Sequence, residues 1–190
     1  MDYGVQMKKV LSYIGIFLII FLLTFRFHVG KLPILTQVTE PTLFKILLFL
    51  GADINAHKKG GDSVFLYNVK QVNMAYRDIK AYKGKTKLYP IEKGFLKMDQ
   101  QTLEERPKII RILLENSDVD IKWMLFKASA PITIEMLLDA GADIEELNGH
   151  GITPLEYNAY LKDVDTVKFL ISKGAKIDKS NKYLRKILEN

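Results

Sequence analysis

A short motif that recurs along the chain decides how the rest of the sequence is interpreted. It reads LLDAGADI at 137–144, LISKGAKI at 170–177 and LLFLGADI at 47–54, with a weaker version, LLENSDVD, at 113–120. In the three clear copies, a pair of apolar residues is followed by a glycine. Such a pair packs the end of a helix on its neighbours, and glycine adopts the left-handed backbone that ends the helix. Each copy therefore predicts the end of a helix.

The spacing of these motifs predicts a repeat protein. Glycine stands at 51, 84, 141 and 174 and serine takes the corresponding position at 117, so the intervals are 33, 33, 24 and 33 residues. A fixed period of this length is typical of stacked helical units. Ahead of the last copy, Thr153 is suited to cap a helix and Pro154 to occupy its first position. The segment 63–69 stands twelve residues after Gly51, the same phase that Thr153 has after Gly141.

The segment TPLEYNA at 153–159 resembles the T-P-L-H-x-A signature of ankyrin repeats, with Glu156 in place of the histidine. The resemblance covers residues 31–190 and is strongest over 135–178. It implies an all-α ankyrin-repeat solenoid of about four to five helix-turn-helix repeats, in which a terminal capping helix shields the last repeat.

The glycine phase divides the predicted solenoid into units. The 24-residue interval leaves no room for the usual finger loop, so we expect a helix over 121–129 joined tightly to a helix over 133–140. The stretch 69–106 keeps the phase but lacks the apolar pair, and it is either a degenerate repeat or an insertion one period long. The predicted units are a partial first repeat (31–55), a repeat with a basic second half (56–88), a divergent repeat (89–120), a shortened repeat (121–145), an ankyrin repeat (146–178) and a capping helix (179–190).

The amino end predicts a membrane segment after a short tail, residues 1–9. Val10–Phe25 is an uncharged apolar run, about 24 Å long as a helix and about 30 Å if it extends to Val29 with Arg26 reaching the interface. We expect a single transmembrane signal-anchor over 10–29, with the repeats on the periplasmic side of a bacterial inner membrane. The alternative is a cleaved signal peptide and a secreted protein, although aromatics and a cation stand where small residues are needed for cleavage. The basic residues on the two sides nearly balance, so orientation stays open.

Charge is distributed unevenly. The 190-residue chain has a net charge of +6, and residues 70–97 alone hold eight basic against two acidic residues, so the remainder is neutral. Residues 128–161 hold six acidic residues and no Lys or Arg. In residues 70–97, lysines interleaved with tyrosines favour binding to anionic lipid or to single-stranded nucleic acid. The alternative is that this stretch is a solvated, divergent repeat. The predicted basic patch is Lys80, Lys83, Lys85 and Lys87.

Enzymatic activity finds no support in the motifs. The chain has no cysteine, which excludes disulfides, thiolate metal sites and cysteine nucleophiles. It contains no phosphate-binding loop, nucleophile elbow or histidine–carboxylate metal pattern, and the acidic stretch 135–146 lacks the ligand order of a calcium loop. We expect no enzyme, no cofactor, no metal and no small-molecule substrate.

By resemblance, ankyrin repeats bind proteins through finger-loop tips and the exposed side of each first helix. The candidate positions that this implies are His150, Ile152, Tyr160 and Leu161 in the last full repeat and Lys59, Asp62, Lys70 and Gln71 in the earlier one. Tyr160 and Leu161 either face a partner or pack on the capping helix. The sequence therefore predicts a membrane-anchored protein that binds an unknown protein partner as an adaptor or as an immunity-type inhibitor. The alternative is an electrostatic module that binds anionic lipid or, less favoured, nucleic acid through residues 70–97.

Overall fold

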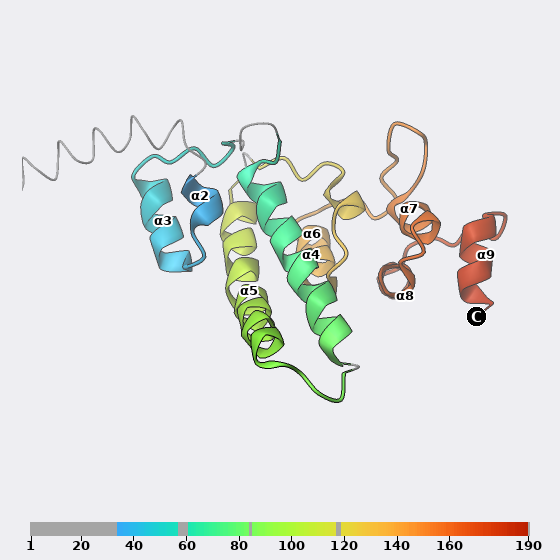
Figure 1. The fold of residues 1–190 in the computed structure, drawn as a ribbon. Helices are drawn as coiled ribbons and strands as arrows, with labels where there is room; N and C mark the ends of the chain where they lie inside the picture. Colours follow the sequence, from blue (N-terminus) through green and yellow to red (C-terminus); the bar gives the residue numbers. More distant parts are fainter. Residues whose placement is uncertain (1–33, 57–60, 84, 117–118, 190) are drawn as a thin grey trace, which may run out of the picture. The chain divides into compact units, whose positions relative to one another are not determined.

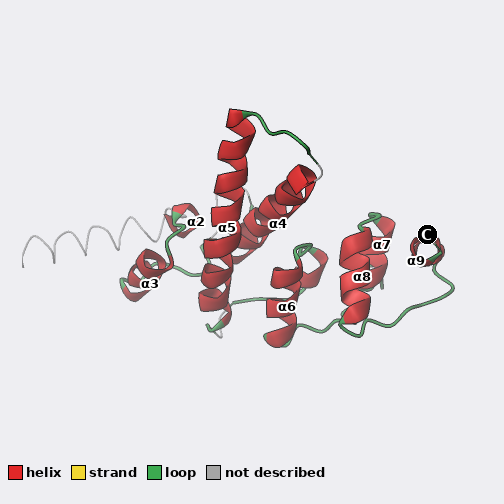
Figure 2. Ribbon diagram, turned by 90° about the horizontal axis from the view of Figure 1, so that it is seen from below, coloured by secondary structure: helices red, strands yellow, loops and turns green. Residues whose placement is uncertain are grey.

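The computed structural model describes residues 34–56, 61–83, 85–116 and 119–189, and the regular elements of these segments are all helices (Figures 1 and 2). This confirms the all-α prediction. The predicted membrane segment 10–29 lies outside the described residues. Within the described segments, no helix combines the length and the apolar character needed to cross a bilayer. The chain divides into two compact units, residues 1–64 and 65–190, which are described separately.

The described residues of the first unit form two short helices, α2 (Ile34–Gln37) and α3 (Pro41–Phe49). The carboxylate of Glu40 caps α3, accepting hydrogen bonds from the backbone amides of Leu43 and Thr42 (2.5 and 2.9 Å). These bonds lower the pKa of Glu40, because they favour its charged form. Phe44 and Leu47 are buried on the inner side of α3.

The second unit holds the remaining described helices. The two long ones come first, and short helices follow towards the carboxyl end (Figure 1). They are α4 (Val64–Lys83), α5 (Pro90–Leu114), the 3₁₀ helix η1 (Met124–Phe126), α6 (Pro131–Asp139), α7 (Pro154–Tyr160), α8 (Val164–Ser172) and α9 (Lys182–Leu188). The predicted capping helix corresponds to α9.

The recurring motif forms the same helix end in each clear copy. Gly51, Gly141 and Gly174 have φ angles of 88°, 91° and 97°, in the left-handed region that only glycine adopts readily. In every copy the amide of the following alanine donates to the carbonyl of the first residue of the apolar pair, at 2.9 Å after Gly51 and Gly141 and 3.0 Å after Gly174. The motif is therefore a helix-ending device, as the sequence predicted.

The helix pair α7–α8 is built as the sequence indicates. Thr153 and Glu156 form a capping box: the Thr153 hydroxyl accepts from the Glu156 amide (3.3 Å), and the Glu156 carboxylate accepts from the Thr153 amide (2.9 Å). Leu155 on α7 and Val167 and Leu170 on α8 are fully or almost fully buried. Glu156, which replaces the histidine of the family signature, therefore holds the start of α7.

The start of α4 shows the burial pattern of α7. Residues 61–70 and 151–160 alternate buried and exposed positions identically, with Asn68 equivalent to the buried Asn158. The end of α5 carries the buried residues Ile109, Ile110 and Leu113 next to the weakest copy of the motif. We interpret α4 and α5 as the two helices of one repeat, lengthened at the ends that the connecting loop joins.

This arrangement differs from the two helix pairs expected over 56–88 and 89–120, because the structure has a single helix in each range. Neither glycine nor proline occurs inside α4, so nothing ends that helix before Lys83. The helix α5 continues through Pro107, although a proline in a helix interior removes a backbone hydrogen bond. Pro107 is one of the buried residues of α5.

The shortened repeat also differs in detail from the expectation. Where a helix was expected over 121–129, the chain forms only the 3₁₀ turn η1, and α6 begins at Pro131 rather than at Thr133. Trp123 precedes η1 with a left-handed φ of 59°, and its amide donates to the Glu146 carboxylate (2.9 Å). Too few residues separate the motifs for a full first helix, so a tight turn takes its place.

Polar side chains join successive helices of the second unit. Asn73 on α4 donates to the Lys127 carbonyl (2.6 Å) and accepts from the amides of Ser129 and Ala130 (3.0 and 3.1 Å). The Thr166 hydroxyl on α8 donates to the Ser129 carbonyl (3.2 Å). The segment before α6 is thus held from both sides, which fixes the stacking of the short repeat between its neighbours.

Candidate functional site

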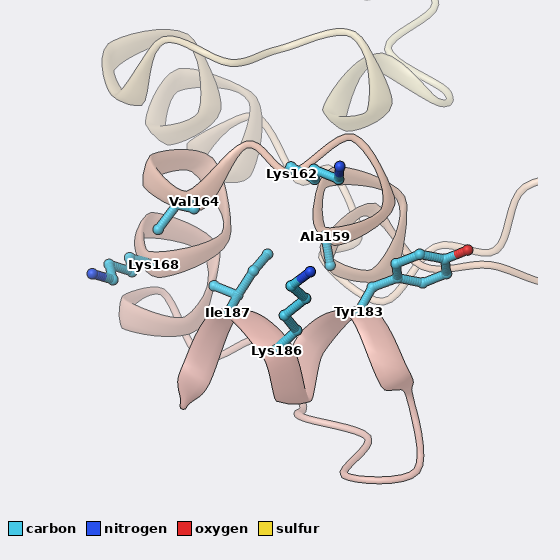
Figure 3. A pocket seen from close by; sticks show the side chains of 7 residues that line it. All are labelled: Ala159, Lys162, Val164, Lys168, Tyr183, Lys186 and Ile187. Atoms are coloured by element: carbon cyan, nitrogen blue, oxygen red, sulfur yellow. The ribbon is translucent and has the colours of Figure 1, made fainter. Parts of the chain in front are cut away.

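A cavity of about 290 Å³ opens where α9 meets α7 and α8 (Figure 3). Its lining combines apolar side chains with three lysines. Ile187 and Lys186 extend from α9 towards Ala159 and Val164, whereas Lys168 points away from the space between the helices (Figure 3). The lining residues are Ala159, Lys162, Val164, Lys168, Tyr183, Lys186 and Ile187.

The last helix is fixed firmly enough to form one wall of this cavity. Asn181 caps α9, its side-chain oxygen accepting from the amides of Tyr183 and Leu184 (3.0 and 3.3 Å). The same Asn181 side chain donates to Glu156 on α7 (3.3 Å), and Leu184 is completely buried. The helix α9 therefore closes the stack and also presents side chains to α7 and α8.

The backbone at Lys162, in the turn between α7 and α8, is unusual for a lysine. Its φ angle is 60°, in the left-handed region, which costs a residue with a side chain about 1 kcal/mol relative to glycine. The turn is tight, since the Asp163 amide donates to the Asn158 carbonyl (3.0 Å) and the Val164 amide to the Lys162 carbonyl (3.0 Å). A strained residue that lines a cavity points to a use for its side chain.

Tyr160 and Leu161 lie beside this turn and expose large apolar surfaces. Their exposed fractions are 60% and 53%. The Tyr160 ring packs edge-to-face on Tyr183 of α9, with ring centroids 5.3 Å apart. The ring therefore contacts the capping helix and also leaves most of its surface exposed to solvent.

His150 and Ile152 belong to a separate place, the loop that precedes α7. Asn148 organises this loop: its side-chain oxygen accepts from the amides of His150 (2.9 Å) and Ile152 (3.2 Å). His150 is exposed and Ile152 is half-buried. The seven residues of α7, about 10 Å of helix, separate this loop from Tyr160, so the predicted set forms two groups. The Asn148-Gly149 pair is a turn signal that would have indicated the organising residue.

The equivalent positions in the earlier repeat are less prominent. Lys59 lies outside the described residues. Asp62 is half-buried ahead of α4, Lys70 is exposed on α4, and Gln71 is half-buried there. Lys70 occupies the position in α4 that Tyr160 occupies in α7. The helix α7 ends there, but α4 continues, so α4 has no turn equivalent to the one at Lys162.

Two of the four lysines in the predicted basic patch are engaged within the protein. Lys80 forms an ion pair with Asp165 of α8. Lys85 pairs with Glu92 (2.6 Å) and lies over the Tyr82 ring (5.1 Å). That ion pair raises the pKa of Lys85 and lowers the pKa of Glu92. Lys83 and Lys87 are exposed.

Carboxylates of the acidic stretch 128–161 form contacts within the protein. The Glu145 carboxylate accepts from the Lys176 amide (2.7 Å), and Glu135 pairs with Lys173 (2.5 Å). The Glu146 carboxylate accepts from the Trp123 amide (2.9 Å) and the Glu156 carboxylate from the Asn181 side chain (3.3 Å), so these contacts join segments of successive repeats. Among the residues that the structure describes, no group of three or more histidines and carboxylates could hold a metal ion.

The geometry of α7 and α8 agrees with a comparison against protein-family models. Residues 150–182 match the ankyrin repeat. The matched segment runs from the exposed loop residue His150 to the first residue of α9, and it supports an ankyrin-repeat protein, a class that serves typically as a protein–protein interaction module. No curated protein and no solved structure matches the chain.

Sequence reasoning missed the contribution of α9 to the site. The segment 180–188 was interpreted only as a cap, whereas Tyr183, Lys186 and Ile187 line the cavity. A signal was present in the sequence KYLRKIL at 182–188, where apolar and basic residues alternate along a helix of two turns. Lys162 was missed because its left-handed backbone cannot be recognised from the residue type.

Proposed function

We propose that this protein captures a partner protein through the end of α7, the turn at Lys162 and the cavity beside α9. The observation that carries the proposal is the exposed pair Tyr160–Leu161, which directly precedes the cavity-lining residue Lys162 in a segment that matches the ankyrin repeat. Aromatic anchors next to a pocket are typical centres of binding energy. The strained Lys162 is a second indication, because glycine would form the same turn at lower cost.

The lining indicates what the partner presents. The apolar lining of Ala159, Val164 and Ile187 suits an aliphatic or aromatic side chain, and Lys162 suits a neighbouring carboxylate. We therefore infer a partner segment in which a large apolar residue is flanked by acidic ones. Capture of such a segment is compatible with an adaptor and with an immunity-type inhibitor, and both are roles of the same surface.

Site-specific crosslinking tests this function. A photo-reactive residue at Leu161 is expected to form discrete adducts in cells, and Tyr160→Ala is expected to reduce them, with a loss of affinity of about 1 to 3 kcal/mol. The matched control places the photo-reactive residue at Ser172, which is exposed on α8 of the same repeat. Equal adducts from both positions, or a destabilised Tyr160→Ala protein that still binds normally once folded, would contradict the proposal.

Lys162→Gly separates binding from stability in the same experiment. The change relieves the left-handed strain, so the melting temperature should rise. If the lysine contacts acidic groups of the partner, capture should weaken in spite of the more stable fold. If Lys162→Gly is stabilised and still binds the partner fully, Lys162 does not contribute to binding, and Tyr160 and Leu161 are the centre of the site.

We also propose that the repeats are held at a membrane, on the periplasmic side of a bacterial inner membrane, by a signal-anchor over residues 10–29. The support is the apolar run at 10–25 with lysines immediately before it. The full-length mass should be recovered from the membrane fraction after alkaline or high-salt extraction. Recovery of a soluble protein, or of a mature amino terminus near Val29, would favour the cleaved signal peptide instead.

A further inference from the structure

The long hairpin of α4 and α5 has a distinctive end, called here the hairpin tip and defined as residues 82–83 and 85–98. The helices α4 and α5 have 20 and 25 residues, or about 30 and 37 Å, whereas α6 and α8 have nine residues, or about 14 Å. Figures 1 and 2 show α4 and α5 side by side, with their joining loop beyond the end of α6. The tip therefore projects from the repeats of the second unit.

The hairpin tip exposes an apolar stripe. Ile91, Phe95 and Met98 are 68%, 50% and 65% exposed, and their spacing of four and three residues puts them on one side of α5. Tyr89, at the start of the helix, is also exposed. Four large apolar side chains exposed within ten residues call for a binding partner.

The hairpin tip is also strongly basic. It contains five lysines and one acidic residue, Glu92. Glu92 is occupied by Lys85 and by the Tyr89 amide (2.8 Å), so its charge is already balanced within the tip. The other lysines, Lys83, Lys87, Lys93 and Lys97, are exposed.

We propose that the hairpin tip docks on an anionic lipid surface. Ile91, Phe95 and Met98 enter the boundary between headgroups and acyl chains, where apolar side chains lose their contact with water. The exposed lysines stay at the level of the phosphates, to which each contributes through its charge. Tyr89 suits the interface itself, because its ring is apolar and its hydroxyl is polar.

The shape and chemistry of the stripe favour lipid over other acidic partners. Its side chains stand on the outer surface of a helix, and a deformable lipid interface accepts such a convex surface without a preformed groove. Single-stranded nucleic acid would gain by stacking on aromatic rings, but Ile91 and Met98 offer no ring. This docking is independent of the α7–α9 surface, because the two sites share no residue.

The test uses the full chain in lipid nanodiscs with a tryptophan reporter at the tip. The chain has a single tryptophan, Trp123, so Phe95→Trp in a Trp123→Phe background reports the tip alone. In discs of equal parts phosphatidylserine and phosphatidylcholine, the emission maximum should move to shorter wavelength, and it should stay unchanged in phosphatidylcholine alone. The shift should reverse at high salt. Lys93→Gln should weaken docking about fivefold, the equivalent of the roughly 1 kcal/mol expected per lysine near an anionic surface.

The matched control carries the reporter at Gln100, which is exposed on the opposite side of α5, nine residues after Ile91. Gln100→Trp should show no lipid-dependent shift. The proposal is overturned if Phe95→Trp emission is the same in both lipids, if both reporters shift equally, or if an oligonucleotide shifts the emission where anionic lipid does not. Tyr160→Ala should leave the tip signal intact, so failure of this proposal is distinguishable from failure of the proposed function.

Discussion

Leu170→Ala is expected to destabilise the second unit by about 2 to 5 kcal/mol, the cost of removing a buried leucine side chain. Leu170 is the first residue of the motif's apolar pair, is fully buried on α8, and accepts the Ala175 hydrogen bond that closes the helix end through its carbonyl. Truncation removes contacts of a side chain that has no exposed surface and leaves a cavity in the core. Urea denaturation followed by circular dichroism measures the change.

Leu161→Ala in the same repeat is the matched control. Leu161 is half-exposed and follows the last residue of α7, so its truncation should change stability by less than about 0.5 kcal/mol. A loss equal to that of Leu170→Ala would show that Leu161 is a core residue and is unavailable to a partner. A negligible loss from Leu170→Ala would contradict the repeat register.

The elements that the sequence predicted correctly are those set by local chemistry. A glycine with positive φ ends a helix at Gly141 and Gly174, and Thr153 with Pro154 begins one, because each depends on a few neighbouring residues. Threonine followed by proline, and an apolar pair followed by glycine, are typical of helix starts and helix ends. The match of residues 150–182 to the ankyrin repeat falls where such signals are densest.

The long hairpin of α4 and α5 could not be predicted in the same way, because it depends on the lack of helix-ending residues and not on a motif. The helix α4 continues past Lys70 because no glycine or proline follows to end it. In α5, Pro107 would predict a helix break from the sequence, but the helix runs through it. The glycine phase of 33 residues fits two short repeats and one lengthened pair equally well. Only contacts between residues far apart in the sequence distinguish them.

The site was predictable for exposed residues of one helix and not for the cavity. Tyr160 and Leu161 stand out because large apolar side chains at exposed positions require a reason. The cavity depends on how α9 packs on α7 through Leu184 and Asn181, which lie more than twenty residues away. Its lysines are dispersed along the sequence and have no common spacing.

Arg106→Leu is expected to destabilise the α4–α5 pair by about 2 to 4 kcal/mol, since it removes a buried charged partner. Arg106 is 6% exposed, and its guanidinium donates to the Asn68 side chain on α4 (2.7 Å) and lies over the Tyr67 ring (5.4 Å). Burial lowers the pKa of Arg106, because desolvation disfavours its charged form. Chemical denaturation followed by circular dichroism measures the loss.

Because burying the Arg106 charge is costly, the stability lost in Arg106→Leu can be restored in part by a second substitution. Replacing both partners, Arg106→Leu with Asn68→Leu, should restore part of the stability, because apolar pairs often substitute for buried charged contacts at little cost. Arg111→Leu is the control, since Arg111 is exposed on the same helix and its removal should cost less than about 0.5 kcal/mol. If Arg106→Leu costs no more than Arg111→Leu, α4 and α5 are not joined through this contact.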